Sequence, residues 1–247
     1  MNGTPPTVGI VVIGRNEGER LRRCLTSVMS YRPHVVYVDS DSTDDSVAWA
    51  EAHGFDVVRL DMSRPFTAAR ARNAGVEHLL EHFPDLKYMQ FVDGDCELDL
   101  GWIHKAAAAL AAEPDVAIVC GTLTERDTQT SIYKRLCDME WQGPVGDIDA
   151  CGGIFMTDMQ AFEQVGRFNP TIPAGEEPEL CKRLAAVGRR IVRLDADMAT
   201  HDAAITTFLQ WWRRGKRTGH GYAYVRAVQG DTNAYGSREI RSAQLWG

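Results

Sequence analysis

Short apolar runs alternate with amphipathic segments along the first half of the chain. The apolar runs predict buried strands, and the segments between them place apolar residues three and four positions apart, as one face of a helix does. In residues 17–30, for example, Leu21, Cys24, Leu25 and Val28 follow this spacing. The predicted strands cover residues 8–14, 34–40, 55–61, 86–93 and 116–123, and the predicted helical segments cover 17–30, 41–54, 67–83 and 100–113.

This alternation predicts an α/β fold with a Rossmann-type, mostly parallel central sheet and helices on both of its faces. In such sheets, ligands bind beyond the carboxyl ends of the strands. Polar clusters stand at three of these ends, in residues 15–17, 39–45 and 93–99. The sequence therefore predicts a binding site along this edge of the sheet.

The second half of the chain is less regular. Its pattern predicts a strand over residues 151–158, a short helix directly after it, a helix over 174–188, a strand over 189–202 and a long helix over 205–226. We expect a catalytic domain over residues 1–204, with a nucleotide-binding half of about 1–123 and an acceptor and base half of about 124–204. A basic, aromatic helical tail, residues 205–247, is expected to pack on or beside this domain.

Composition narrows the classes of partner. The 247 residues carry a formal net charge of −7, the opposite of the usual balance in nucleic-acid-binding proteins, so we expect no nucleic-acid partner. Residues 205–241 carry about +5, which leaves about −12 on the rest of the chain. A basic tail on an acidic body favours a polyanionic ligand or an anionic membrane surface as partner.

The cysteines and the hydropathy pattern bear on the cellular compartment. The six cysteines include no C-x-x-C pair, so neither a zinc site nor a redox motif is indicated. The sequence shows no signal-peptide pattern and no apolar stretch of membrane-spanning length. We therefore expect a cytoplasmic protein with reduced thiols, and association with the inner face of the membrane is an open alternative.

Residues 90–99, QFVDGDCELD, place four acids within seven positions. Asp93 and Asp95 point to the same side of an extended strand end, and the glycine between them lets the backbone approach a ligand. Hard oxygen ligands grouped in this way suit Mg²⁺ or Mn²⁺. The alternative is that the acids only cap and solvate a loop, which we favour for Glu97 and for Asp99 at the start of the next helix.

Other features of this region separate the classes of enzyme. Cys96 would prefer a softer metal, so we expect it to pack in the interior. Aspartate-based phosphotransferases and nucleotidyltransferases also place acids at the ends of parallel strands. A Rossmann dehydrogenase fits poorly, because no G-x-G-x-x-G follows the first strand.

Five motifs, in this order, resemble the family 2 glycosyltransferases of the GT-A fold. They are VVIGRNEGERLRRCL, VYVDSDSTDDS, ARNAG, FVDGDCELD and GEEPELCKRL, and the resemblance runs from about residue 8 to about residue 226. It implies an inverting enzyme that uses a nucleotide-diphospho-sugar of UDP or GDP type. It also implies a divalent cation, Mn²⁺ or Mg²⁺, held by a D-x-D motif.

The resemblance implies roles for single residues. Asp39 matches the acid that contacts the base or ribose, and Arg72 matches an arginine near the donor. Asp93 matches the first acid of the D-x-D motif, beside the ribose or the metal. Asp95 matches the metal ligand, and Glu177 matches the catalytic base.

The first and the last of the five motifs carry further candidate residues. Arg15 and Glu17 of the first motif are assigned to the donor site. The family often has Glu-Asp where this chain has Glu176-Glu177, so Glu176 stays the alternative base. At a helix start the dipole favours ionised carboxylates, as a base requires. The other interpretation is that both residues are only first-turn helix acids.

His201 stands near the end of the predicted strand over 189–202. A histidine at this place in related enzymes completes the metal shell or touches the diphosphate, and the alternative is an ordinary hydrogen-bonding residue. Asp202 beside it is expected to orient the imidazole ring.

The predicted tail helix carries the last candidates. Arg213 and Arg217 share one face and are assigned to the donor, where they would neutralise the diphosphate or a phosphorylated acceptor. Two alternatives stay open. Either Trp211, Trp212 and the basic face rest on a membrane surface, or the helix only packs on the domain with a solvated basic face.

Together these features predict a metal-dependent inverting glycosyltransferase acting on a hydroxyl acceptor, for a cell-surface glycan or glycolipid. A sugar nucleotidyltransferase of similar fold is one alternative, and a catalytically inactive sugar-nucleotide-binding protein is another. The identity of the acceptor and the oligomeric state stay open at this point.

Overall fold

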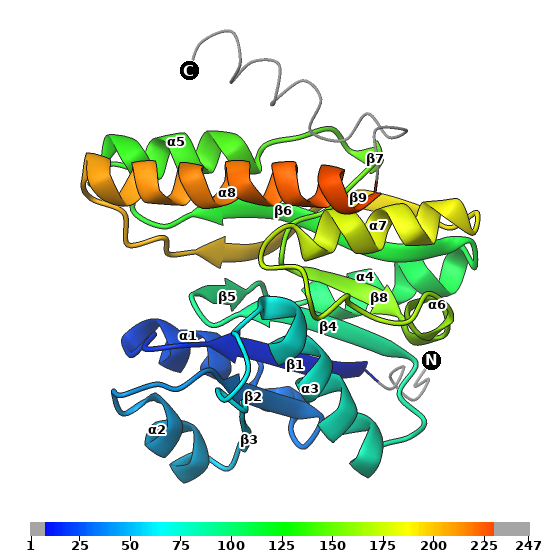
Figure 1. Cartoon of the computed structure of the whole chain (residues 1–247). Helices are drawn as coiled ribbons and strands as arrows, with labels where there is room; N and C mark the ends of the chain where they lie inside the picture. The colour runs from blue at the N-terminus through cyan, green and yellow to red at the C-terminus, as the bar shows by residue number, and fades with distance from the viewer. Residues whose placement is uncertain (1–7, 230–247) are drawn as a thin grey trace, which may run out of the picture.

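A computed structural model describes residues 8–229, and the strands of this part of the chain join into one sheet (Figure 1). The strands are β1 Val8–Gly14, β2 Val35–Asp39, β3 Asp56–Arg59, β4 Tyr88–Asp93, β5 Cys96–Leu98, β6 Val116–Glu125, β7 Gly146–Asp147, β8 Phe155–Asp158 and β9 Arg190–His201. The helices are α1 Glu19–Ser27, the short 3-10 helix η1 Met29–Tyr31, α2 Ser46–Ala52, α3 Ala68–His82, α4 Trp102–Ala112, α5 Ile132–Trp141, α6 Met159–Gln164, α7 Glu176–Ala186 and α8 Phe208–Gln229.

The sheet is mixed but mostly parallel. Its order is β3-β2-β1-β4-β8-β6-β9-β5, and β7 pairs with β9 outside this path. The first four strands of this order are parallel neighbours, and β6 is parallel to β9. β8 runs antiparallel between β4 and β6. The predicted α/β class with a mostly parallel sheet is therefore confirmed.

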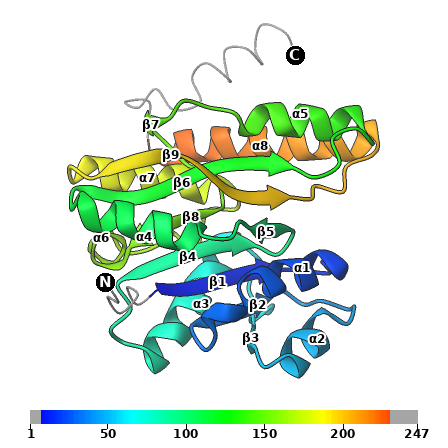
Figure 2. The ribbon, with the colours of Figure 1, turned by 180° about the vertical axis from the view of Figure 1, so that it is seen from behind.

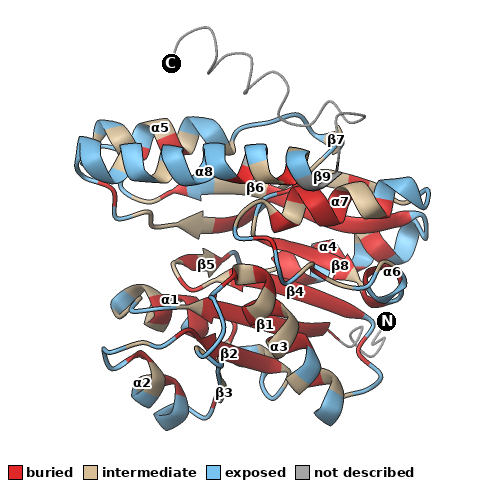
Figure 3. Cartoon of the chain, viewed as in Figure 1, coloured by how far each residue is buried: buried red, intermediate tan, exposed pale blue. Residues whose placement is uncertain are grey.

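Helices cover both faces of the sheet. α3 packs on β1 and β2, and it lies on the near face in Figure 1 together with α7 and α8. α4 packs on β6, β8 and β9 and lies on the opposite face, which is turned to the viewer in Figure 2. This coverage explains why the central strands are nearly continuous apolar runs, since both of their faces are buried (Figure 3).

The close approach of α3 to the sheet depends on a glycine. A Cβ added to Gly75, the glycine of the ARNAG motif, would lie 2.4 Å from Val11 Cγ1 and 3.0 Å from Val38 Cγ2. Because no side chain stands there, the backbone of α3 rests directly on the two strands. This contact fixes the position of Arg72, about one turn earlier on α3, whose side chain is only 2% exposed.

The apolar pattern locates most elements and misses three in the described part of the chain, namely β5, α5 and β7. β5 begins directly after the turn formed by Gly94 and Asp95 and pairs with β9. Asp99 does not cap the next helix, because the N-cap of α4 is Gly101. The expected helix-start role of Asp99 is therefore wrong.

The tail helix α8 lies beside α5 in both views (Figures 1 and 2). Trp211 on α8 packs against Tyr133 on α5 with ring centroids 6.3 Å apart. Gly221 lies against the backbone just before α7, where a Cβ would come within 3.1 Å of the Ala174 carbonyl oxygen. No helix among the described residues, α8 included, combines the length and apolar character needed to cross a membrane. Residues 230–247 of the expected tail lie outside the described residues.

Two Gly→Ala substitutions in helices should have opposite effects. Gly75→Ala should lower the free energy of unfolding by about 1–3 kcal/mol, because its methyl group overlaps Val11 on the sheet. Gly215→Ala should raise it by about 0.5–1 kcal/mol, because this glycine on α8 is exposed with no heavy atom within 4 Å of the added Cβ. Urea unfolding of both variants measures the two changes. Equal effects would contradict the packing of α3 described above.

Candidate active site

The ends of four strands gather the polar residues of the site. Asp39 ends β2, Asp93 ends β4, Glu125 ends β6 and His201 ends β9. These strands run in one direction, so their carboxyl ends meet along one edge of the sheet. The predicted location of polar clusters at this edge is the one that the structure shows.

The D-x-D motif lies in the turn between β4 and β5. The backbone N–H of Gly94 donates to the Ile13 carbonyl at 2.8 Å, and a Cβ at this glycine would lie 3.1 Å from the same oxygen. The turn is thereby held against the end of β1. Asp95 Oδ2 lies 3.4 Å from His201 Nε2, which brings the second acid of the motif to the end of β9.

Arg72 is shared by three carboxylates. Its Nη1 donates to Glu176 Oε1 at 2.7 Å and to Glu177 Oε1 at 2.9 Å, and its Nη2 donates to Asp93 Oδ1 at 3.0 Å. Nη2 also donates to the Gly153 carbonyl at 3.4 Å. One buried cation therefore joins α3, the end of β4 and the start of α7 in one cluster.

Three acids around one arginine leave excess negative charge, and this changes the pKa of Glu177. Burial, followed by the charge of Glu176, raises the pKa of Glu177 from 4.5 to about 8, although Arg72 opposes the shift. The start of α7 is expected to favour ionisation through its dipole. That expectation is wrong for Glu177, because desolvation and the neighbouring acid outweigh the dipole.

Glu17 lies beside the D-x-D turn. A Cβ added to Gly94 would lie 3.3 Å from Glu17 Cγ, and the carboxylate of Glu17 pairs with Arg20 at 2.5 Å. Burial and the nearby charge of Asp95 raise the pKa of Glu17 to about 7. A third carboxylate is thus close enough to the motif to respond to any cation bound there.

His201 is oriented by a residue that the sequence analysis does not identify. Its Nδ1 lies 2.5 Å from Glu125 Oε2, and Glu125 also accepts from the Ala203 backbone N–H at 2.8 Å. Burial lowers the pKa of His201, but hydrogen bonds to Asp95 and Glu125 raise it to about 10 overall. The imidazole therefore bridges the two carboxylates, with Nε2 toward Asp95.

The prediction that Asp202 orients the imidazole ring of His201 is wrong. Its carboxylate pairs with Arg23 at 2.9 Å and with Lys134 at 3.1 Å instead. Successive residues at a strand end point to opposite sides, so Asp202 and His201 take different partners. The usable signal for Glu125 is that it is the first acid at the end of the apolar run over 116–123.

Asp39 accepts hydrogen bonds from its own strand and from the loop that follows it. Its Oδ1 accepts from the Tyr37 hydroxyl at 2.8 Å, and its Oδ2 accepts from the backbone N–H groups of Asp41 and Ser42 at 3.1 and 3.0 Å. Arg15 is exposed and lies 3.7 Å from Asp41. Asp39 and Arg15 stand at the expected edge of the sheet, but these hydrogen bonds and this ion pair do not join them to the Arg72 cluster.

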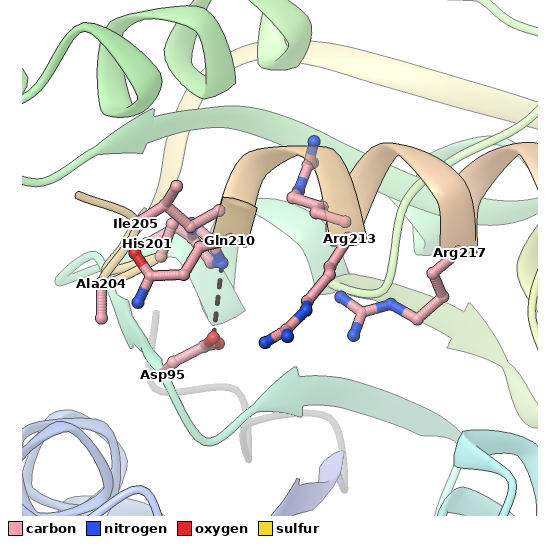
Figure 4. Close-up of a pocket in the computed structure, with 9 residues that line it drawn as sticks. Asp95, His201, Ala204, Ile205, Gln210, Arg213 and Arg217 are labelled. Atoms are coloured by element: carbon pink, nitrogen blue, oxygen red, sulfur yellow. Dashed lines mark ion pairs between the residues drawn. The ribbon is translucent and has the colours of Figure 1, made fainter. Parts of the chain in front are cut away.

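A cleft of about 310 Å³ separates the D-x-D turn from α8 (Figure 4). Asp95 and His201 form one side of it, and Arg213 and Arg217 project from α8 toward the same space. Gln210 also lines the cleft. The structure therefore brings the predicted metal residues and the two predicted tail arginines to one cavity.

Cys96 packs in the hydrophobic core with 1% exposure, as expected. Its Sγ nevertheless lies 3.4 Å from Asp95 Oδ1, so it stands directly beneath the D-x-D turn. Glu97 pairs with Arg126. The four acids of residues 90–99 thus separate into the pair at the site and two that lie outside it.

The family model described as glycosyl transferase family 2 matches residues 9–166. The chain belongs to this family. The resemblance inferred from the five motifs is thereby confirmed.

The curated relatives that the chain resembles are named as glycosyltransferases. The chain is 27% identical over 233 residues to the pre-mycofactocin glycosyltransferase of Mycobacterium tuberculosis (strain H37Rv), which covers 90% of this chain and 48% of that protein. A shorter match, 43% identical over 51 residues, covers 21% of this chain and 18% of an uncharacterised glycosyltransferase of Rickettsia conorii. The chain therefore spans about half the length of the first of these relatives.

Two solved structures share the fold. The crystal structure of GalNAc-T7 with UDP, GalNAc and Mn²⁺ gives a TM-score of 0.66 at 17% identity, over 92% of this chain and 48% of that one. The mannosyltransferase PcManGT from Pyrobaculum calidifontis in complex with GDP-Man and Mn²⁺ gives 0.67 at 19% identity, over 92% and 65%. These likenesses confirm the predicted GT-A fold.

Removing the positive charge of Arg72, which three carboxylates share, should destabilise the chain strongly. Arg72→Met should lower the free energy of unfolding by about 3–5 kcal/mol, because it leaves three carboxylates without their buried partner. Arg59→Met is the matched control, since Arg59 is 63% exposed and its single pair with Glu51 should be worth less than about 1 kcal/mol. Urea unfolding at neutral pH compares the two variants. Similar losses would contradict the central place of Arg72.

Proposed function

We propose that this chain is a metal-dependent inverting glycosyltransferase that moves a sugar from a nucleoside-diphosphate sugar to a hydroxyl acceptor. One observation carries the proposal: Arg72 joins Asp93 of the D-x-D motif to Glu177 at the start of α7. Groups suited to a diphosphate and to a general base therefore stand at one edge of the sheet. The family supports this activity, and the solved relatives with bound UDP or GDP-Man and Mn²⁺ support the donor class.

The residues present fit a divalent cation. Asp95, Cys96 and His201 each offer a ligand atom, and these atoms lie within 4.8 Å of one another. We assign the ion to Asp95 and His201, because an oxygen and an imidazole donor suit Mn²⁺ and Cys96 is buried in the core. In this assignment the ion takes the place of the proton that the imidazole of the metal-free chain shares with Asp95. When bound, such a cation stabilises the negative charge of the departing diphosphate as a Lewis acid.

Arginines from α8 supply further positive charge. Arg213 and Arg217 line the cleft that Asp95 and His201 border. Transfer leaves a diphosphate with added negative charge, and fixed cations around it stabilise the transition state. We therefore assign both arginines to the diphosphate, and we assign Arg15 and Asp39 to the nucleoside half of the donor.

Glu177 is the proposed base. An acceptor hydroxyl is a weak nucleophile until a carboxylate takes its proton, and a base works best when its pKa lies near the working pH. The pKa of Glu177, raised to about 8, meets this condition. Its side chain is 14% exposed, against 6% for Glu176, so Glu177 is the more accessible of the two. Glu176 then serves to hold Arg72.

The donor class can be tested by binding. UDP or GDP should raise the melting temperature only when Mn²⁺ is present, because a ligand that binds the native state stabilises it in proportion to the logarithm of its concentration over Kd. Incubation of the matching sugar nucleotides should release the nucleoside diphosphate, measured by chromatography. The proposal would be overturned if neither nucleotide bound in the presence of Mn²⁺ and no UDP- or GDP-sugar released its nucleoside diphosphate.

The two glutamates should separate in kinetics. Glu177→Gln should reduce kcat by about 10²–10⁴-fold with nucleotide binding intact, because the proton acceptor is lost. In the parent chain, kcat/KM should fall about tenfold per pH unit below about 8, since protonated Glu177 cannot act as base. A larger loss of kcat in Glu176→Gln than in Glu177→Gln would reassign the base to Glu176.

The orientation of His201 can be tested without turnover. Glu125→Gln should weaken Mn²⁺ binding by about 10–100-fold, because a partner that fixes a metal-binding imidazole contributes this much to affinity. Asp95→Ala should weaken it at least as strongly, and Asp202→Asn is the matched control beside the same histidine. Titration calorimetry with Mn²⁺ gives all three values. An unchanged affinity in Glu125→Gln would remove Glu125 from the metal site.

A further inference from the structure

A second cavity lies on the other side of Asp93 and His201. It has a volume of about 390 Å³ and runs from these two residues between β6, β9 and the segment 148–154. Its buried lining residues include Cys96, Cys120, Ile154 and Met198, each less than 7% exposed. Trp141, Leu123, Ile148 and Ala150 complete its largely apolar wall.

This cavity ends at the reacting groups. Gly153 lines it, and a Cβ added there would lie 2.7 Å from Asp93 Oδ2 and 3.3 Å from Glu177 Oε1. The cavity therefore reaches Asp93 of the D-x-D motif, and Gly153 brings its wall next to the proposed base. The cleft beneath α8 lies at Asp95 and the tail arginines instead. The two cavities meet at His201, which borders both.

The chemistry of the wall disfavours a polyhydroxylated ligand. A sugar chain needs many hydrogen-bonding partners, and the charged groups of this wall already have theirs. Arg193 donates to the Trp141 carbonyl at 2.6 Å, and Glu140 pairs with Arg214. Asp93 and His201 stand at one end of the cavity, and apart from glycines the rest of the wall is aliphatic, aromatic or sulfur-bearing, which favours an apolar body.

One polar group of the wall is without a partner. The indole N–H of Trp141 is buried and has no hydrogen-bond acceptor among residues 8–229. A buried donor of this kind is costly to leave unpaired. This N–H is covered by the protein and offers no contact to a ligand in the cavity, so a ligand with many hydroxyl groups would find no donor here and would bury several of its own groups unpaired.

We propose that this cavity binds the acceptor, and that the acceptor is a small alcohol or phenol with an apolar body. The inference rests on the proposed glycosyl transfer and adds to it the chemical class of the substrate. The volume falls within the range of about 300–1,000 Å³ that suits one small molecule. The apolar body lies among Met198, Ile154 and Leu123, with its hydroxyl at the Glu177 end.

The reaction in this arrangement balances in one displacement. The acceptor oxygen bonds to the anomeric carbon of the donor sugar as the bond from that carbon to the diphosphate breaks. The electron pair of the broken bond leaves with the nucleoside diphosphate. The hydroxyl proton passes to Glu177.

A single substitution can close the cavity. Gly152 lines it and is exposed, and a Cβ there would meet no heavy atom within 4 Å, so Gly152→Phe should be accommodated at its Cβ and place a ring at the cavity wall. Gly219→Phe on α8 is the matched control, because Gly219 is also exposed with no neighbour within 4 Å and does not line the cavity. The probes are 4-butylphenol and maltotriose, measured by titration calorimetry, with UDP and GDP in Mn²⁺ as a separate titration.

The expected result is that 4-butylphenol binds the parent chain and the Gly219→Phe variant, and that its Kd rises about tenfold or more in Gly152→Phe, a loss of about 1.4 kcal/mol. Nucleotide binding should be equal in all three chains. In the parent chain, 4-butylphenol should also increase release of nucleoside diphosphate from the sugar donor, and this increase should be lost in Gly152→Phe.

Three outcomes would overturn the inference: maltotriose binding that Gly152→Phe removes, 4-butylphenol binding equal in all three chains, or no binding of 4-butylphenol to the parent chain. A different result would overturn the proposed function itself. In that case 4-butylphenol would bind in the cavity as expected, but neither nucleotide would bind with Mn²⁺.

Discussion

The guanidinium of Arg72 lies among three carboxylates, and the rest of the site depends on this contact. Along the sequence, Asp93 lies 21 residues from Arg72, and Glu176 and Glu177 lie 104 and 105 residues from it. α3 reaches them because Gly75 lets the helix rest directly on β1 and β2. The arginine is thus a structural cation, which joins α3 and the end of β4 to the start of α7, where the proposed base Glu177 lies.

The single positive charge of Arg72 does not neutralise three carboxylates, and the remaining negative charge makes one of them easier to protonate. A full balance would hold every carboxylate ionised and inert. Here burial and the charge of Glu176 raise the pKa of Glu177 to about 8, so this group can exchange a proton near neutral pH. Asp95 is affected in the opposite direction. Burial raises the pKa of Asp95, but its hydrogen bond to His201 outweighs burial, and the pKa is lowered overall. Two carboxylates of one site therefore have environments suited to different roles.

The sequence predicts the sheet and the edge where the site lies, because apolar periodicity and polar strand ends are local signals. It identifies Asp93 and Asp95 for the same reason and His201 through the family resemblance, and the structure brings Asp95 and His201 together. It does not predict that Glu125 instead of Asp202 orients His201, because that choice depends on which side of the strand end each residue faces. Nor does it predict the ionisation of Glu177, since the dipole of α7 is a local property whereas burial by α3 and β4 is not. The helix α5, within a region without a readable motif, completes the cavity proposed for the acceptor.

The proton affinity of Glu177 is the most direct test of this account. Carboxyl ¹³C NMR of chain labelled at glutamate, with the signal assigned through its loss in Glu177→Gln, gives the titration midpoint of this one residue. We predict a midpoint near 8 in the metal-free chain. A midpoint near the ordinary value of 4.5 would contradict it, because the cluster around Arg72 would then be electrically satisfied and would not prepare a base.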